Sequence, residues 1–318
     1  MIVSVVVSNY NYARFLPACL DSVLAQTYKK LEIIVVDDGS TDDSRVVLES
    51  YAPRVRAIFQ PNGGQASAIN RGVAESNGDV LCFLDSDDGW APEKVERVLA
   101  VLNQHPEIGW VRHKARMVDE SQRPLSSVAP MFSGSKSIPA DPALFLERVV
   151  TVQPGCLAIT RQVADKVFPI IVTPALAFDA DDAVMLARIF ATGQPGYSID
   201  EVLGFYRRHA GERFGAHDIP KLLRREADVA EALAGIFGDR PAPSATFKLR
   251  AIVGAMEGAS WWDTRRRQPF LRGLSAVMRL WRRPQLMVRQ GTSLTMAFMV
   301  PDFWLRRLAK SQSWPPVN

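Results

Sequence analysis

Ile33–Ser40 has the sequence IIVVDDGS, and Val80–Asp88 has the sequence VLCFLDSDD. Each stretch is an apolar run that ends in acidic residues. An uninterrupted apolar run predicts a strand that is buried on both faces of a parallel sheet. Ligands of such sheets bind where the strands end. The two stretches therefore place two acidic clusters at the edge of the sheet where chemistry is expected.

Clustered carboxylates repel one another unless a cation neutralises them. Hard oxygen ligands favour Mg²⁺ or Mn²⁺, and these ions in turn hold phosphates. Two solvated turns would contain the same residue types, because Asp and Gly are common in turns. The equivalent position of both clusters, each at a strand end, favours a binding site.

The alternation of patterns predicts the fold class. Strands are expected at residues 2–8, 31–37, 55–59 and 80–84. Between them we expect amphipathic helices: one with the apolar face Leu16, Leu20, Val23 and Leu24, one that Ser40 or Thr41 caps and that runs through Tyr51, and one at 66–76. This βαβαβαβ order is typical of an α/β fold with a doubly wound, mostly parallel sheet. A helix should follow Pro92 as far as Gln104, then a strand at 110–118 and a polar loop at 121–139.

Four motifs then occur in order along the chain. They are SVVVSNYN (Ser4–Asn11), DDGSTD (Asp37–Asp42), NGGQASAINRG (Asn62–Gly72) and DSDD (Asp85–Asp88). Together they resemble the family 2 glycosyltransferases. The resemblance covers about the first two-thirds of the chain and fades after Gly211. It implies a Rossmann-like fold of the glycosyltransferase A type at residues 1–215, with a donor-nucleotide half (1–100) and an acceptor half (101–215).

The resemblance also implies roles for individual residues. The residues implied to bind the base and ribose of a nucleotide-diphospho-sugar donor are Ser8, Asn9, Tyr10 and either Asp37 or Asp38. The implied donor site also includes Gly64, Asn70 and Ser86. Asp85 contacts the ribose or a metal-bound water. Asp87 ligates Mn²⁺ or Mg²⁺ at the diphosphate, and His209 ligates the metal or touches the diphosphate. Arg207 binds phosphate in a bidentate manner.

A third acidic patch follows at Asp179–Asp182, where it opens an amphipathic helix. In the family a Glu-Asp pair stands at this place, and its Asp deprotonates the acceptor hydroxyl. Matching the helix and the following Gly193 puts Asp182 on the catalytic Asp and Asp181 on the Glu. The shorter Asp181 departs from the family pattern, which leaves the base open between these two residues. Helix capping by acids would give the same pattern without catalysis.

The C-terminal segment must be interpreted without the resemblance. Thirteen Lys or Arg and three acids between Lys248 and Lys310 give it a net charge of +10, whereas the rest of the chain carries −6. Aromatic residues precede basic pairs three times, at 261–267, 281–283 and 303–307. This pattern is typical of helices that bind an anionic membrane surface, although Trp residues packed on the enzyme would also produce it. No nucleic-acid-reading motif accompanies the charge. We expect a helical extension at 216–318.

Composition is consistent with an enzyme in the cytoplasm, peripheral on the inner face of the membrane if the extension binds lipid. The three cysteines lie among apolar neighbours, which predicts reduced thiols. The first predicted strand begins at residue 2, and we expect no signal peptide. No apolar stretch approaches the ~18 to 20 residues that span a bilayer.

The sequence therefore predicts an inverting, metal-dependent glycosyltransferase that acts on a saccharide or lipid-linked acceptor. A nucleotidyltransferase would share the nucleotide, the metal and the acidic strand ends, but it would release pyrophosphate. A catalytically inactive protein that binds a nucleotide sugar is the third alternative, and the departure at Asp181 would then mark the lost activity.

Overall fold

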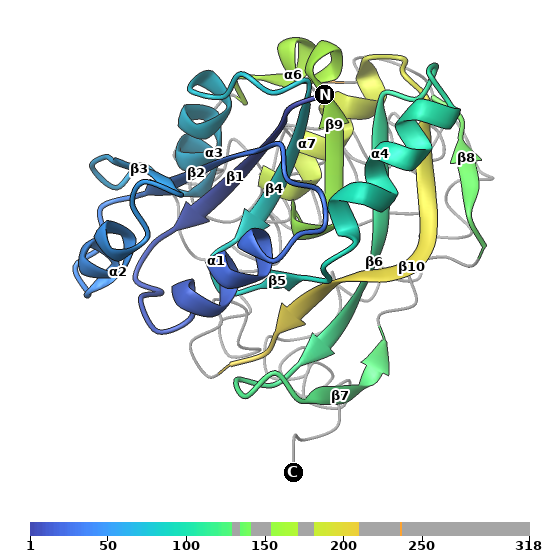
Figure 1. Cartoon of the computed structure of the whole chain (residues 1–318). Helices are drawn as coiled ribbons and strands as arrows, with labels where there is room; N and C mark the ends of the chain where they lie inside the picture. Colours follow the sequence, from blue (N-terminus) through green and yellow to red (C-terminus); the bar gives the residue numbers. More distant parts are fainter. Residues whose placement is uncertain (129–133, 141–153, 171–180, 210–235, 237–318) are drawn as a thin grey trace, which may run out of the picture. The chain divides into compact units, whose positions relative to one another are not determined.

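The computed structural model describes residues 1–128, 134–140, 154–170, 181–209 and 236 (Figure 1). All of them belong to one compact unit, which consists of Met1–Gly215 and Gly235–Gly238. The second unit, Ala216–Ala234 with Asp239–Asn318, lies outside the described residues. The helical extension at 216–318 and the boundary before it therefore stay predictions.

Four parallel strands form the first part of the sheet. They are β1 (Val3–Asn9), β2 (Leu31–Asp37), β3 (Arg56–Phe59) and β4 (Val80–Asp85), and they lie in the order β3-β2-β1-β4. The crossovers that parallel strands require contain α1 (Leu16–Leu24), α2 (Ser44–Ser50) and α3 (Gln65–Ala74). Each strand and helix predicted for this part of the chain is present.

The sheet continues from β4 through β9, β6 and β10 to β5. The strands are β5 (Gly89–Trp90), β6 (Trp110–Val118), β7 (Pro124–Val128), β8 (Lys136–Ile138), β9 (Leu157–Thr160) and β10 (Gly196–Arg207). Strand β9 runs antiparallel to both β4 and β6, whereas β6 and β10 are parallel. The helical segments are α4 (Lys94–Gln104), the 3-10 turn η1 (Pro154–Cys156), α6 (Arg161–Val167) and α7 (Asp181–Ala191). The result is a mixed, mostly parallel α/β sheet.

Helices flank both faces of this sheet (Figure 1). On one face Val3, Val5 and Val7 of β1 share a buried cluster with residues of α1, α2 and α4. On the other face α3 lies so close that a Cβ at Gly72 would be 2.3 Å from Cγ1 of Val6. Because only glycine allows this approach, α3 packs tightly on the strands and its first residue, Gln65, reaches the acidic edge of the sheet.

The predicted start of α2 is wrong. The helix begins at Ser44, and Ser40 does not cap it, because the Ser40 hydroxyl accepts hydrogen bonds from the backbone N–H of Asn11 (2.9 Å) and from Asn9 Nδ2 (3.3 Å). The Asp42 carboxylate accepts the Ser44 N–H instead (3.0 Å). A contact across about thirty residues thus outcompetes the local cap that the sequence favoured.

The predicted loop at 121–139 is also wrong in part, because it contains β7 and β8. Strand β7 pairs antiparallel with β6, and β8 pairs antiparallel with β10. Polar residues and a proline at a strand start are tolerated at sheet edges. Edge strands of this kind are therefore easily mistaken for loops.

The three cysteines are free and buried, as predicted. In the part of the chain that the structure describes, no helix has the length and apolarity needed to cross a bilayer.

Candidate functional site

An open cleft lies at the carboxyl ends of the parallel strands. The register of β1 against its neighbours aligns Ser8 with Asp85 and Asn9 with Asp37. The cleft encloses about 720 Å³ of empty space, part of it open to solvent. Its lining residues are Ser8, Asn9, Tyr10, Tyr12, Asp38, Gln65, Ala68, Asp85, Ser86, Asp87 and Tyr206. Seven of the residues that the sequence assigned to the donor or the metal thus line one cavity.

Asp37 supports the cleft from behind. Its side chain is buried, and it accepts hydrogen bonds from Asn9 Nδ2 (2.8 Å) and from the Ser40 N–H (2.9 Å). These bonds fix the orientation of the Asn9 amide at the cleft wall. The Asn9 Oδ1 atom is buried and has no hydrogen-bond partner among the described residues. A buried acceptor of this kind gains from a donor that a ligand or a water brings.

Asp38 ties two loops together. Asp38 is only 3 % exposed, and its carboxylate accepts hydrogen bonds from the N–H groups of Gly63 (3.0 Å) and Gly64 (2.8 Å) and from Gln60 Nε2 (2.7 Å). Gly64 has a φ of 86°, in the region that favours glycine. The glycine pair therefore takes its conformation from a buried carboxylate, and this conformation starts α3 beside the cleft.

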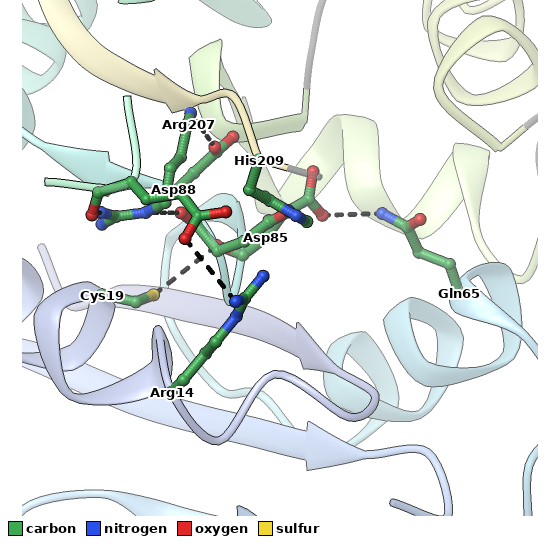
Figure 2. Close-up of polar contacts among 9 residues, drawn as sticks. Arg14, Cys19, Gln65, Asp85, Asp88, Arg207 and His209 are labelled. Atoms are coloured by element: carbon green, nitrogen blue, oxygen red, sulfur yellow. Dashed lines mark hydrogen bonds and ion pairs between the residues drawn. The ribbon is translucent and has the colours of Figure 1, made fainter. Parts of the chain in front are cut away.

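Asp85 is held from two elements. One of its oxygens, Oδ1, accepts Ser8 Oγ from β1 (3.2 Å) and Gln65 Nε2 from the start of α3 (2.7 Å), as Figure 2 shows for Gln65. Below the turn, the Cys19 thiol donates to the Asp85 carbonyl (3.6 Å). Burial, reinforced by the carboxylates of Asp88, Asp87 and Asp85, raises the pKa of Cys19 well above its ordinary value. The thiol is therefore a neutral packing group.

The turn after β4 brings three carboxylates together. Asp88 is buried, and burial raises its pKa well above the ordinary value, with the charges of Asp87 and Asp85 adding to the rise. Asp87 lies at the cleft, and its Oδ2 is 3.1 Å from Nε2 of the buried His209. The His209 ring packs edge-on against Tyr12 (5.4 Å between centroids) and at a tilt against Phe15 (4.8 Å). The prediction that His209 and Asp87 belong to one site is consistent with this geometry.

The chemistry of these side chains fits a divalent ion that substrate phosphates help to hold. Repulsion among the carboxylates is relieved by a cation, and Mg²⁺ in particular is usually bound by one or two carboxylates plus phosphate oxygens and water. No group of three or more His, Cys, Asp or Glu side chains forms a complete metal cage in the described ranges. A metal at Asp85 and Asp87 would therefore need further ligands, from water or from a bound substrate.

Arg207 lies behind the turn, and the described lining of the cleft does not include it. Its side chain is buried, and it donates from Nε to the Asp87 carbonyl (2.7 Å) and from Nη1 to the Glu120 carbonyl (2.9 Å). Its backbone N–H donates to Asp88 Oδ1 (2.9 Å). The sequence predicted a bidentate phosphate contact, but these bonds point the guanidinium at two main-chain carbonyls.

Asn70 makes a different contact from the donor contact that the sequence predicted. Its Nδ2 donates to the Ile170 carbonyl (2.8 Å), and its Oδ1 accepts the Ile170 N–H (2.8 Å). Both polar atoms of the Asn70 side chain are thus bonded to the backbone of one residue, Ile170, which follows α6.

Asp181 is the first residue of α7, and the side chains of Asp181 and Asp182 lie outside the described part of the structure. The assignment of the base stays a prediction.

Comparison with known proteins identifies the family. The family model described as Glycosyl transferase family 2 matches residues 4–168, which is more than half of the chain. The chain belongs to glycosyl transferase family 2. The family predicted from the four sequence motifs is confirmed, and so is the class of enzyme, a glycosyltransferase.

Relatives of this family 2 chain carry the same class name. An uncharacterised glycosyltransferase of Nostoc sp. is 40% identical over 175 residues, which are 54% of this chain and 54% of the relative. The uncharacterised glycosyltransferase EpsJ of Bacillus subtilis is 43% identical over 107 residues, which are 33% of this chain and 31% of the relative. The matches thus span about half or less of the length of these relatives.

Solved structures share the fold. TarS of Staphylococcus aureus, crystallised with UDP-GlcNAc, has a TM-score of 0.61 at 16% identity and covers 86% of this chain and 80% of its own. The mannosyltransferase PcManGT of Pyrobaculum calidifontis, solved with GDP-Man and Mn²⁺, has a TM-score of 0.54 at 17% identity, over 97% of this chain and 84% of its own. The predicted glycosyltransferase A fold is confirmed.

Four lining residues of the family 2 cleft were missed by the sequence analysis. They are Tyr12, Gln65, Ala68 and Tyr206. Gln65 and Ala68 stand within the NGGQASAINRG motif, and Tyr206 directly precedes Arg207. Their proximity in sequence to predicted site residues could have indicated them. The direction in which each side chain points, however, depends on how α3 and β10 pack.

The Asn70 contact gives a first prediction. Asn70→Ala should lower the free energy of unfolding by about 2 kcal/mol, because a buried N–H and a buried carbonyl of Ile170 lose their partner. Urea denaturation measures this change. Asn103→Ala, at an exposed position of α4, is the matched control and should stay within about 0.5 kcal/mol of wild type. A stability loss no larger than that of the control would show that the two hydrogen bonds contribute nothing.

Proposed function

We propose that this chain transfers a sugar, with inversion, from a nucleotide-diphospho-sugar to a hydroxyl of a saccharide or lipid-linked acceptor, assisted by Mn²⁺ or Mg²⁺. The observation that carries the proposal is the cleft itself, which gathers Asp85, Ser86 and Asp87 with Ser8 and Asn9 at the strand ends. The nucleotide sugars bound to TarS and to PcManGT, and the Mn²⁺ of the latter, support it by analogy of fold.

In this proposal the nucleoside binds along the ends of β1 and β2. Ser8, Asn9, Tyr10 and Asp38, whose side chains carry hydroxyl, amide and carboxyl groups, line the cavity there. Ribose hydroxyls and base edges need donors and acceptors of these kinds. Asp37 acts indirectly, since it orients Asn9. The Asn9 Oδ1 atom, buried without a described partner, would accept an N–H from the ligand.

The diphosphate binds at the turn after β4. Asp85, oriented by Ser8 and Gln65, and Asp87, beside His209, would hold the metal together with phosphate oxygens. The bound ion would supply Lewis-acid stabilisation of the charge that grows on the nucleoside diphosphate as it leaves. Gly64 places the N-terminus of α3 beside this region, where free N–H groups favour anions.

The acceptor reacts from the side of α7. Asp182, with Asp181 as the alternative, takes the proton of the acceptor hydroxyl, whose oxygen attacks the anomeric carbon in line with the departing diphosphate. Transfer of this kind releases a nucleoside diphosphate, whereas a nucleotidyltransferase would release pyrophosphate.

A prediction for the metal tests the core of this proposal. In a thermal-shift panel, UDP, GDP and their sugars should raise the Tm of wild type further when Mn²⁺ is present, by mass action on the folded state. Asp87→Asn should abolish the Mn²⁺-dependent part of the shift. The variant without ligand should be at least as stable as wild type, because it loses repulsion among neighbouring carboxylates.

Asp165→Asn, at an exposed position of α6, is the matched control and should keep the full shift. If Asp87→Asn retains the metal-dependent shift, Asp87 is not a ligand. If no member of the panel shifts wild type, the proposal of a nucleotide-sugar site is wrong.

A prediction for the base concerns turnover. Asp182→Asn should reduce kcat by about 10² to 10⁴, the usual contribution of a positioned general base, and leave the Kd of the nucleoside diphosphate unchanged. Steady-state kinetics and calorimetry measure the two quantities. Equal losses in affinity and turnover would instead indicate a helix-capping role. A larger loss in Asp181→Asn would move the base to that residue.

The final part of the proposal is that the C-terminal segment places the enzyme on an anionic membrane. It is supported by the sequence of that segment, which lies outside the described residues. Replacing Arg265, Arg266 and Arg267 by Gln in the full chain should weaken binding to anionic vesicles by about 1 kcal/mol per charge in a sedimentation assay. Neutral vesicles are the control. Binding that ignores both lipid charge and added salt would disprove this part.

A further inference from the structure

Arg207 stands at the end of β10, directly behind the acidic turn Asp85–Asp88 (Figure 2). The residue is only 5 % exposed. Its side chain donates from Nε to the Asp87 carbonyl (2.7 Å) and from Nη1 to the Glu120 carbonyl (2.9 Å), and its backbone N–H donates to Asp88 Oδ1 (2.9 Å). Two consecutive residues of the turn are therefore attached to β10 through one residue.

The turn is anchored differently on its other side. The Ser86 N–H donates to the Ser8 carbonyl of β1 (3.2 Å), and the Asp88 N–H closes the turn onto the Asp85 carbonyl (3.0 Å). These backbone bonds hold Ser86 to β1 and bring the two ends of the turn together. Asp87, whose carboxylate lies at the cleft, is held in addition by the contacts of its carbonyl with Arg207 and of its carboxylate with His209.

A layer of rings and charges keeps the guanidinium in place. The Cζ atom of Arg207 lies 5.0 Å from the centroid of the Phe15 ring, and the centroids of the Phe15 and His209 rings are 4.8 Å apart. Arg14 also lies over Phe15 (4.3 Å) and forms an ion pair with Glu120 (3.6 Å). Glu120 is thus held both by Arg14 and by Arg207, so the carbonyl that receives Nη1 belongs to a fixed segment.

We infer that Arg207 is a positioning residue that holds Asp87 at the cleft, and that it does not itself bind the donor phosphates. If Arg207 holds Asp87 in place, metal-dependent binding of the diphosphate should require Arg207. This consequence rests on the proposed nucleotide-sugar function. The guanidinium suits this role because its planar fork directs separate N–H groups at two carbonyls. A lysine ammonium would keep the charge but present a single nitrogen.

Arg207→Lys separates the two roles of this residue, and Arg208→Lys is its matched control at the exposed neighbouring position. The first measurement is hydrogen exchange of residues 86–90 in the full chain without ligand or metal. The expected result is at least tenfold faster exchange in Arg207→Lys, with unchanged exchange in β1 as the internal reference. Arg208→Lys should exchange like wild type.

The second measurement is the Kd of UDP and of GDP, determined by calorimetry with EDTA and with Mn²⁺. In Arg207→Lys the Kd in EDTA should equal that of wild type, whereas the tightening by Mn²⁺ should fall at least tenfold. Wild-type exchange at the turn would overturn the inference. So would an equal loss of affinity with and without metal, because a phosphate ligand acts in both conditions.

If Arg207→Lys does not fold, Arg207→Gln, which keeps a planar amide donor for the Asp87 carbonyl, is measured in the same two assays and must change in the same directions. If neither nucleotide binds wild type, the proposed function fails. The exchange at residues 86–90 then still decides whether Arg207 holds the turn.

Discussion

Buried carboxylates at one edge of the sheet constrain everything around them. Asp37, Asp38 and Asp88 are each at most 4 % exposed, and a buried carboxylate is costly unless donors surround it. Each of them accepts hydrogen bonds from backbone N–H groups. Asp37 accepts from Ser40, Asp38 from Gly63 and Gly64, and Asp88 from Arg207. The loops after β2 and β3 and the end of β10 therefore take their conformations from these acids.

Burial also divides the acids by role. Asp85 and Asp87 are only partly buried and line the cleft, whereas Asp88 is buried and is not among its lining residues. The turn therefore gives the cleft two carboxyl groups that a ligand can reach, and its third carboxyl group is bonded by the backbone N–H of Arg207. Three acids within four residues of the sequence thus become two different kinds of group in the structure.

The sequence predicted the features that depend on local patterns. Strand β2 at Leu31–Asp37 and strand β6 at Trp110–Val118 occur with the predicted bounds, because their residue types favour buried strands whatever their neighbours. The acids at strand ends were also located, since parallel register brings such ends together. The start of α2 was mistaken because the Ser40 hydroxyl is taken by Asn11, about thirty residues away. The partners of Asn70 and Arg207 lie at still greater separations, 100 residues for Ile170 and 87 for Glu120. A local sequence pattern does not indicate which distant carbonyl the side chain of Asn70 or Arg207 will bind.

The bracket that Asn70 forms around Ile170 bears on how such enzymes diversify. Helix α3 begins beside the cleft with Gln65 and, one and a half turns later, fixes the backbone of Ile170 through both atoms of one amide. The backbone at Ile170 is therefore fixed by the same helix that begins at the acidic edge of the sheet. Sequence changes after Ile170 leave this helix and the Gln65 contact with Asp85 in place. A lineage can therefore vary the later part of the chain while the geometry of the cleft is inherited unchanged.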